Sequence, residues 1–174
     1  MSFNNFLYNF SEYALSSLFR VITGIKIRYS EKLEEIRIYQ LEEKDPNILN
    51  SIQDKIWNEF NIKTKIIPDI IDIPKNMRRG NFLITTDAAR ILNDKVERPK
   101  ETALLFVTKY GITPFPFLTT RILQTIFPIL GTSYILYGIC FITTINDRLQ
   151  KEIIDYAAIH EIGHLLGKHG YPIK

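Results

Sequence analysis

The strongest constraint on the fold is an alternation of short, strand-like apolar segments with segments of helical periodicity. The clearest strand is Thr102 to Thr108, a continuous apolar run of strand length. Glu35 to Leu41 alternates polar and apolar residues, which predicts a half-buried strand. Strands separated by helices pair in parallel through crossover connections, so the pattern predicts an α/β (α+β layered) fold with a mixed, mainly parallel twisted sheet.

Four further segments complete this expectation. Asp45-Pro46 opens a helix, with Pro46 near its first position. One face of that helix is predicted to carry Ile48, Leu49, Ile52, Ile56 and Trp57. Asn61 to Ile67 is predicted to be a strand closed by Pro68, and Thr86-Asp87 to cap a short helix through Leu92. Gly111 to Pro116 contains two prolines and is predicted to be irregular.

The stretch between Arg121 and Asp147 contains no charged residue and is long enough to span a membrane. Pro128 and the Gly131-Thr132-Ser133 cluster divide it into two apolar pieces, Thr125 to Leu130 and Tyr134 to Ile145. Pieces of this length suit two buried strands better than one span. Membrane association is therefore the less favoured alternative.

Length and composition are those of a globular chain that folds around one core. The 174 residues suit a single domain over 31–174, preceded by an amphipathic helical extension over 1–30. The extension shows helical spacing of the apolar residues Phe3, Phe6, Leu7, Phe10, Ala14, Leu15 and Leu18. A net charge of +3 from scattered basic residues argues against a nucleic-acid partner.

Two further expectations concern the compartment and the single cysteine. The first residues lack a basic segment followed by an apolar run and a small-residue cleavage site, so cytoplasmic residence is expected. Cys140 is the only cysteine, which excludes an intramolecular disulfide and a multi-cysteine zinc site. Because it lies in an apolar run, we expect it to be a buried small hydrophobe.

The last long element is predicted to be a helix from Asp147 to Gly167 that carries the motif HExxH. Four residues advance a helix by about 400°, so His160 and His164 project from one face, one turn apart. Two imidazole nitrogens at this spacing can bind one Zn²⁺ ion. Glu161 lies about 100° round the helix from His160, within reach of a water on that metal. This pattern predicts metal-assisted hydrolysis of an amide bond, with Glu161 as the catalytic carboxylate and a peptide or protein as substrate.

The third protein ligand must come from elsewhere. No Asp or Glu follows His164 in the sequence. Gly167 can adopt the left-handed conformation that ends a helix and turns the chain back. His169, the only remaining histidine, is therefore the leading candidate.

The motif and its surroundings resemble the metzincin metallopeptidases, and among them the archaemetzincins. The residues that match the family pattern HExxHxxGxxH in place are His160, Glu161, His164 and Gly167. Upstream, Gly138 to Leu149 resembles the strand and the Arg-Leu pair that lead into the family's active-site helix. The resemblance implies a zinc peptidase fold. It also implies that an edge strand, assigned to Thr125 to Leu130, holds an extended substrate. In some relatives a tyrosine assists the oxyanion, which makes Tyr171 a candidate for that role; a surface tyrosine in the tail is the favoured alternative.

The sequence also departs from the family pattern. The third histidine comes one residue early, and no methionine follows the motif, so the family's methionine-containing turn is absent. These departures motivate an alternative function, a catalytically degenerate binding or regulatory protein on the same scaffold. A membrane-associated protease is a third alternative. The sequence alone assigns no substrate-binding residue, specificity or oligomeric state.

Overall fold

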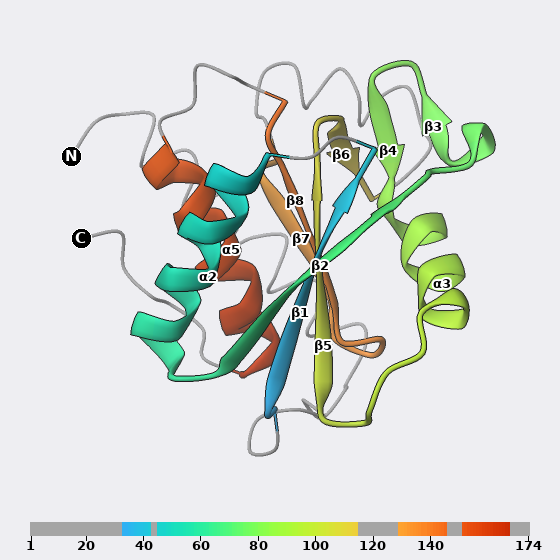
Figure 1. Ribbon diagram of the computed structural model, residues 1–174. Helices are drawn as coiled ribbons and strands as arrows, with labels where there is room; N and C mark the ends of the chain where they lie inside the picture. Colours follow the sequence, from blue (N-terminus) through green and yellow to red (C-terminus); the bar gives the residue numbers. More distant parts are fainter. Residues whose placement is uncertain (1–32, 43–44, 115–128, 146–150, 168–174) are drawn as a thin grey trace.

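The computed structural model describes residues 33–42, 45–114, 129–145 and 151–167. These residues form a layered α/β structure in which a twisted sheet lies between helices (Figure 1). Within the described ranges, no helix is both long enough and apolar enough to cross a membrane. The predicted extension over residues 1–30 lies outside these ranges, so it stays a prediction, as does the single domain over 31–174.

The main sheet has five strands in the order β2-β1-β5-β8-β7. Their bounds are β1 Glu35–Leu41, β2 Lys63–Ile71, β5 Thr102–Thr108, β7 Gly131–Tyr134 and β8 Ile139–Thr143. All neighbouring pairs are parallel except β7 and β8, which are antiparallel. The predicted mixed and mainly parallel sheet is thus confirmed.

Helices cover both faces of this sheet. The helices α2 (Pro46–Phe60) and α5 (Lys151–Leu165) lie on one face, and α3 (Thr85–Lys95) lies on the other (Figure 1). A second sheet adjoins α3, in the order β3-β4-β6, with β3 Arg78–Arg79, β4 Phe82–Ile84 and β6 Gly111–Thr113. The short 3₁₀ helix η1 (Lys75–Met77) precedes it.

Strand β5 shows how the sheet divides the core in two. Ala103, Leu105 and Val107 pack in the cluster with α2 and α5, whereas Leu104 and Phe106 pack in the cluster with α3. Every residue of β5 is buried. A strand covered on both faces has no solvated side, which explains the continuous apolar run in its sequence.

Strand β1 is more deeply buried than predicted. Glu35–Leu41 forms the expected strand, but it lies between β2 and β5, and Tyr39, Gln40 and Leu41 are all buried. The polar Gln40 is accommodated because its Oε1 accepts a hydrogen bond from the Asp45 backbone N–H at 2.7 Å. The predicted alternation is present at Glu35 and Arg37, which are partly exposed, and is lost from Tyr39 to Leu41, because both faces of the sheet are covered there.

Strand β2 continues through Pro68, at which we had expected it to end. The pairing of β1 with β2 shifts register between Ile38 and Gln40, opposite the segment of β2 that contains Pro68. Proline has no N–H to donate, but β2 lies at the end of the strand order. A proline is tolerated at such an edge and at a bulge.

Helix α2 begins as predicted, with Asp45 at its N-cap. The Asp45 side chain accepts hydrogen bonds from the backbone N–H groups of Asn47 and Ile48. Leu49, Ile52 and Ile56 are buried as expected. Trp57 is 52% exposed, so its predicted place on the buried face was wrong.

Helix α3 and strand β6 also differ from the prediction. The helix begins at Thr85 and runs to Lys95, and its N-cap residue, Ile84, makes no side-chain cap hydrogen bond. The Thr85 and Thr86 hydroxyls donate instead to the carbonyls of Thr113 and Pro114. Gly111–Thr113, predicted to be irregular, is a strand because it pairs in parallel with β4.

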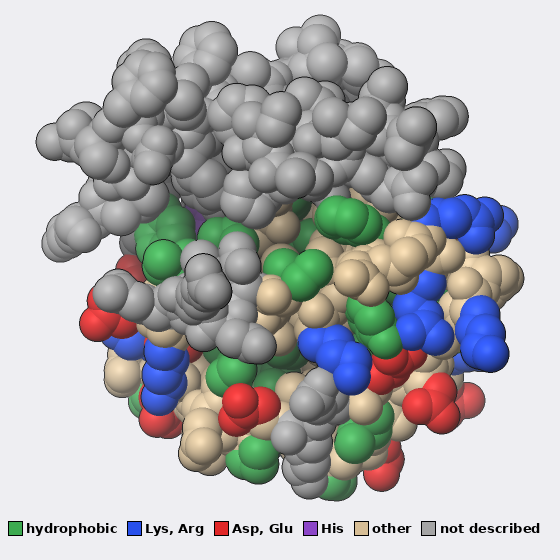
Figure 2. Space-filling model, turned by 90° about the horizontal axis from the view of Figure 1, so that it is seen from above, with side chains coloured by type: hydrophobic (Ala, Val, Ile, Leu, Met, Phe, Trp, Pro, Cys, Tyr) green, Lys and Arg blue, Asp and Glu red, His purple; other side chains and the backbone are tan. Residues whose placement is uncertain are grey.

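The uncharged stretch contains two strands, but their positions are shifted. Strand β7 is Gly131–Tyr134, which includes the Gly-Thr-Ser cluster that is predicted from the sequence to separate the two strands. A turn over residues 135–138 leads into β8, and Gly138 adopts a positive φ of 60° in it. Residues 115–128 lie outside the described ranges, so the rest of the stretch is not tested. Seen from above, Lys and Arg side chains of the described surface lie beside Asp and Glu side chains (Figure 2).

Candidate metal centre

Helix α5 carries the HExxH motif and is packed on several sides. Its buried residues include Ile154, Ala157, Ala158, Ile162 and Leu165. All five belong to the cluster shared with α2 and the inner face of the sheet. Small side chains such as Ala157 and Ala158 let the helix lie close to the strands. The motif is therefore held on a rigid, buried element.

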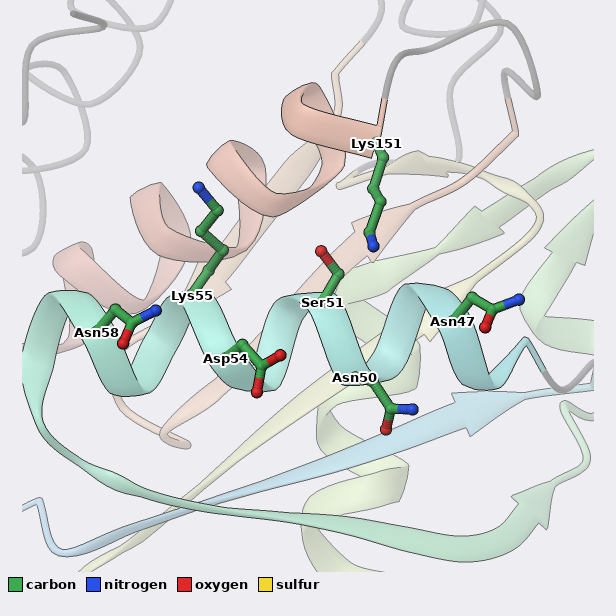
Figure 3. A pocket seen from close by; sticks show the side chains of 7 residues that line it. All are labelled: Asn47, Asn50, Ser51, Asp54, Lys55, Asn58 and Lys151. Atoms are coloured by element: carbon green, nitrogen blue, oxygen red, sulfur yellow. The ribbon is translucent and has the colours of Figure 1, made fainter.

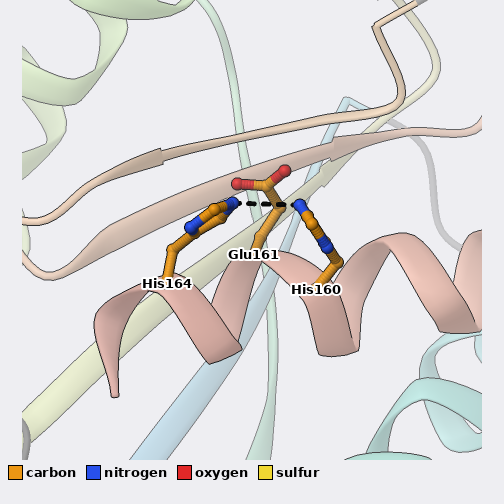
Figure 4. A group of neighbouring side chains, drawn as sticks. All are labelled: His160, Glu161 and His164. Atoms are coloured by element: carbon orange, nitrogen blue, oxygen red, sulfur yellow. Dashed lines mark hydrogen bonds between the residues drawn. The ribbon is translucent and has the colours of Figure 1, made fainter. Parts of the chain in front are cut away.

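His160 and His164 face one another across one helical turn (Figure 4). Their Nε2 atoms are 2.9 Å apart and form a hydrogen bond. The two rings are nearly perpendicular, with an interplanar angle of 89°. The predicted pairing of the two histidines on one face of the helix is thus present.

The two nitrogens fit a zinc ion. Two imidazole nitrogens on one tetrahedral Zn²⁺, at bonds of about 2.0–2.1 Å, stand about 3.3 Å apart. The separation of 2.9 Å would need to open by only about half an ångström, a change that small rotations of the two rings supply. Metal would also replace the proton that the two nitrogens share in this hydrogen bond.

The Glu161 side chain lies beside the histidine pair. One carboxylate oxygen of Glu161 and one nitrogen of each histidine all lie within 4.8 Å of one another. Glu161 is only 4% exposed, whereas both histidines are partly exposed. Among the described residues, the structure thus brings together three of the four predicted site residues. His169, the fourth, lies outside the described ranges, and so does Tyr171.

Two features next to the motif agree with the sequence. Gly167 has a positive φ of 71°, and its N–H donates to the His164 carbonyl at 3.2 Å, so the helix ends where predicted. Cys140 is fully buried, and its thiol donates to the Glu161 backbone carbonyl at 3.4 Å. Burial raises the pKa of the Cys140 thiol well above its ordinary value. Cys140 therefore acts as a neutral packing residue.

The edge strand beside α5 is not the one that the resemblance suggested. Residues 129 and 130 are not in a strand, and the edge strand is β7, Gly131–Tyr134. The assignment to Thr125 to Leu130 is therefore wrong at its described end, and residues 125–128 lie outside the described ranges. Small polar residues form this strand because β8 provides hydrogen-bonding partners for them. The sequence Gly-Thr-Ser does not by itself predict a strand, because the pairing with β8 depends on residues elsewhere in the chain.

The Tyr134 side chain of β7 lies on the α3 side of the sheet, on the opposite face from the histidine pair. It packs in the cluster on the α3 side of the sheet, and its hydroxyl forms a 2.7 Å hydrogen bond with the Thr85 hydroxyl. Burial raises the pKa of Tyr134 to about 12. Its hydroxyl is therefore neutral and faces away from α5.

A separate open depression lies along α2 and the first turn of α5. Figure 3 shows its lining, which consists only of polar side chains: Asn47, Asn50, Ser51, Asp54, Lys55, Asn58 and Lys151. None of these residues belongs to the histidine–glutamate group.

A mainly parallel sheet lies between helices, and one of these helices carries two histidines and a glutamate grouped together; this fold is similar to that of solved archaemetzincins. The solved structures confirm the fold. The archaemetzincin of Archaeoglobus fulgidus, in complex with malonate, superposes with a TM-score of 0.55 at 19% identity, over 76% of this chain and 77% of that chain. The archaemetzincin of Methanopyrus kandleri has a TM-score of 0.55 at 13% identity, over 83% of this chain and 78% of that chain. No protein-family model and no curated protein matches the sequence.

Proposed function

We propose that the protein is a zinc-dependent metallopeptidase in which His160 and His164 bind the ion and Glu161 is the catalytic base. One observation carries the proposal: two Nε2 atoms 2.9 Å apart, with a buried carboxylate beside them. The shared fold with two archaemetzincins supports it.

The donor set fits a single zinc ion. Zinc bound there would polarise a substrate carbonyl and make a water more acidic. Two histidines leave room for a third protein ligand, which we assign to His169. The left-handed Gly167 supports this assignment, because it ends the helix two residues before His169.

The chain itself supplies the proton transfer. Glu161 would accept a proton from the attacking water and then deliver it to the leaving amine. Its carboxylate is buried, so bulk water competes weakly for it, and its side chain lies against Gly131 of β7. The substrate would be an extended peptide. Strand β7 lies at the end of the strand order, so one edge of its backbone is open to such a segment within the described structure.

The test compares Glu161→Gln with Glu152→Gln, a control on the same helix. Glu152 is exposed in the first turn of α5, so its variant should keep both zinc and cleavage. Glu161→Gln should retain near-stoichiometric zinc, measured by mass spectrometry of the metal, and lose chelator-sensitive cleavage of a peptide library. Unchanged cleavage in that variant would refute the mechanism.

Two other outcomes are equally informative. Loss of zinc in Glu161→Gln would make Glu161 a ligand and not a base. Wild-type protein that holds zinc but cleaves no peptide would favour the non-catalytic binding protein. His169→Ala should lower the zinc content to near zero if His169 is the third ligand.

A further inference from the structure

Strand β7 touches the Glu161 side chain at a glycine. A Cβ atom built on Gly131 would lie 2.5 Å from Glu161 Cγ, 2.7 Å from Oε1 and 2.9 Å from Cδ. Ordinary contacts of a Cβ atom begin at about 3.4 Å, so any side chain at position 131 would overlap Glu161 by up to 0.9 Å (3.4 − 2.5). The strand backbone therefore packs directly on the carboxylate side chain.

The strand is poorly placed to move away. Gly131 pairs with Ile142 of β8, and the Thr143 N–H donates to the Leu130 carbonyl at 2.9 Å. Ile142 is fully buried in the core cluster. A displacement of nearly 1 Å at Gly131 would break this pairing at the start of β7.

The backbone of the glutamate is also held by the neighbouring strand β8. Its backbone carbonyl accepts the thiol hydrogen of Cys140, and α5 packs against both β7 and β8. Its side chain is 4% exposed, so little free space surrounds it. If position 131 carried a side chain, the Glu161 carboxylate would have to rotate, and its distance to the His160 and His164 nitrogens would change.

We infer that Gly131 is a positioning residue, whose missing side chain sets the place of the Glu161 carboxylate beside the histidine pair. The contact itself rests on the fold alone. Its catalytic consequence rests on the proposed function. The residue acts through Glu161 and needs no contact with a substrate.

A double-mutant cycle of thermal stability tests the contact without any measurement of activity. Gly131→Ala should lower the Tm by about 2–12 °C, because overpacking of a core destabilises the folded state. In the Glu161→Ala background the clashing atoms are gone. There, Gly131→Ala should leave the Tm unchanged or raise it, since alanine costs less conformational entropy in a strand than glycine.

Gly111→Ala is the matched control. A Cβ at Gly111, in β6, would lie 2.7 Å from two ring atoms of Phe82. Its Tm loss should be the same with and without Glu161. Equal Tm changes for Gly131→Ala in the two backgrounds would overturn the inference, and so would a tolerated Gly131→Ala in the wild-type background.

A second arm measures the catalytic consequence. Gly131→Ala should keep its zinc and its KM, while kcat falls by about 100-fold, the size of effect expected for a misplacement near 1 Å. A rise in KM with unchanged kcat would overturn the positioning role. If the wild type cleaves no peptide, the proposed function fails, but the stability cycle still decides whether Gly131 positions Glu161.

Discussion

Ser51 of α2 and Asp155 of α5 make a polar contact inside the layer formed by these two helices. The Ser51 hydroxyl donates to Asp155 Oδ2 at 2.6 Å. Asp155 is 4% exposed, and its other oxygen, Oδ1, is buried and has no hydrogen-bond partner among the residues that the structure describes. The residues are 104 positions apart in the sequence, so the contact ties α2 to α5, the helix that carries the motif.

Ser51→Ala should destabilise the protein more than its small change in volume suggests. The variant removes the hydroxyl that Asp155 Oδ2 accepts from, and it leaves a buried carboxyl group with neither oxygen paired to a side chain. Leaving a buried polar group unsatisfied costs about 1–3 kcal/mol. The expected loss is therefore about 1–3 kcal/mol of the free energy of unfolding, a large share of the total for a domain of this size.

Asp155→Ala added to Ser51→Ala should recover most of that loss. The second substitution removes the Asp155 carboxyl group, whose two oxygens would otherwise stay buried without a hydrogen bond to a side chain of the described structure. The two residues are in contact, so their effects should not add.

The measurement is urea unfolding at pH 7, with linear extrapolation and a check that the slope m is unchanged. Asn50→Ala, at an exposed position next to Ser51, is the control and should lie within about 0.5 kcal/mol of the wild type. A Ser51→Ala variant as stable as this control would refute the reasoning. So would a double variant that is less stable than Ser51→Ala alone.

Three further outcomes follow from burial and charge. Cys140 is buried and its thiol pKa is raised, so the folded protein should resist thiol reagents at neutral pH and react only on unfolding. Above the ordinary thiol pKa the thiol ionises in the unfolded state alone, so the free energy of unfolding should decrease as the pH rises. The hydrogen bond from Arg37 lowers the pKa of Glu35. In urea unfolding, Glu35→Gln should therefore lower the free energy of unfolding by about 0.5 kcal/mol at neutral pH. This difference should vanish as the pH falls through the lowered pKa, because the Glu35 carboxylate is then protonated in the wild type as well. Trp57, the only tryptophan, is 52% exposed, so its fluorescence should be readily quenched by iodide in the folded state; a shielded tryptophan would contradict its placement on α2.

The elements that could be predicted are those whose determinants are local. The spacing of His160 and His164 fixes their adjacency through helix geometry alone, and the structure has them in hydrogen-bond contact. Asp45 caps α2 through its own neighbours, and Gly167 ends α5 by its own backbone freedom. The run Thr102 to Thr108 is apolar throughout because both of its faces are covered, and that pattern is visible in the sequence.

The errors arose where a partner distant in sequence decides the structure. Gly111–Thr113 is a strand because β4 pairs with it, and Gly131–Tyr134 because β8 does. Pro68 does not end β2, since the strand lies at the edge of the sheet. Trp57 follows the helical spacing of the apolar residues of α2, but its side chain is 52% exposed, so the core does not extend over it.

By itself, the sequence determined the class of fold, the helix with its HExxH group, and the zinc chemistry that this group predicts. Only the tertiary structure decided what surrounds that group: Gly131 against the Glu161 side chain, Cys140 beneath its backbone, and Ser51 against Asp155. The physical reason is the range of the interactions. Helical spacing is set by neighbouring residues, whereas the space left for a buried carboxylate depends on strands and helices that pack together only when the whole chain has folded.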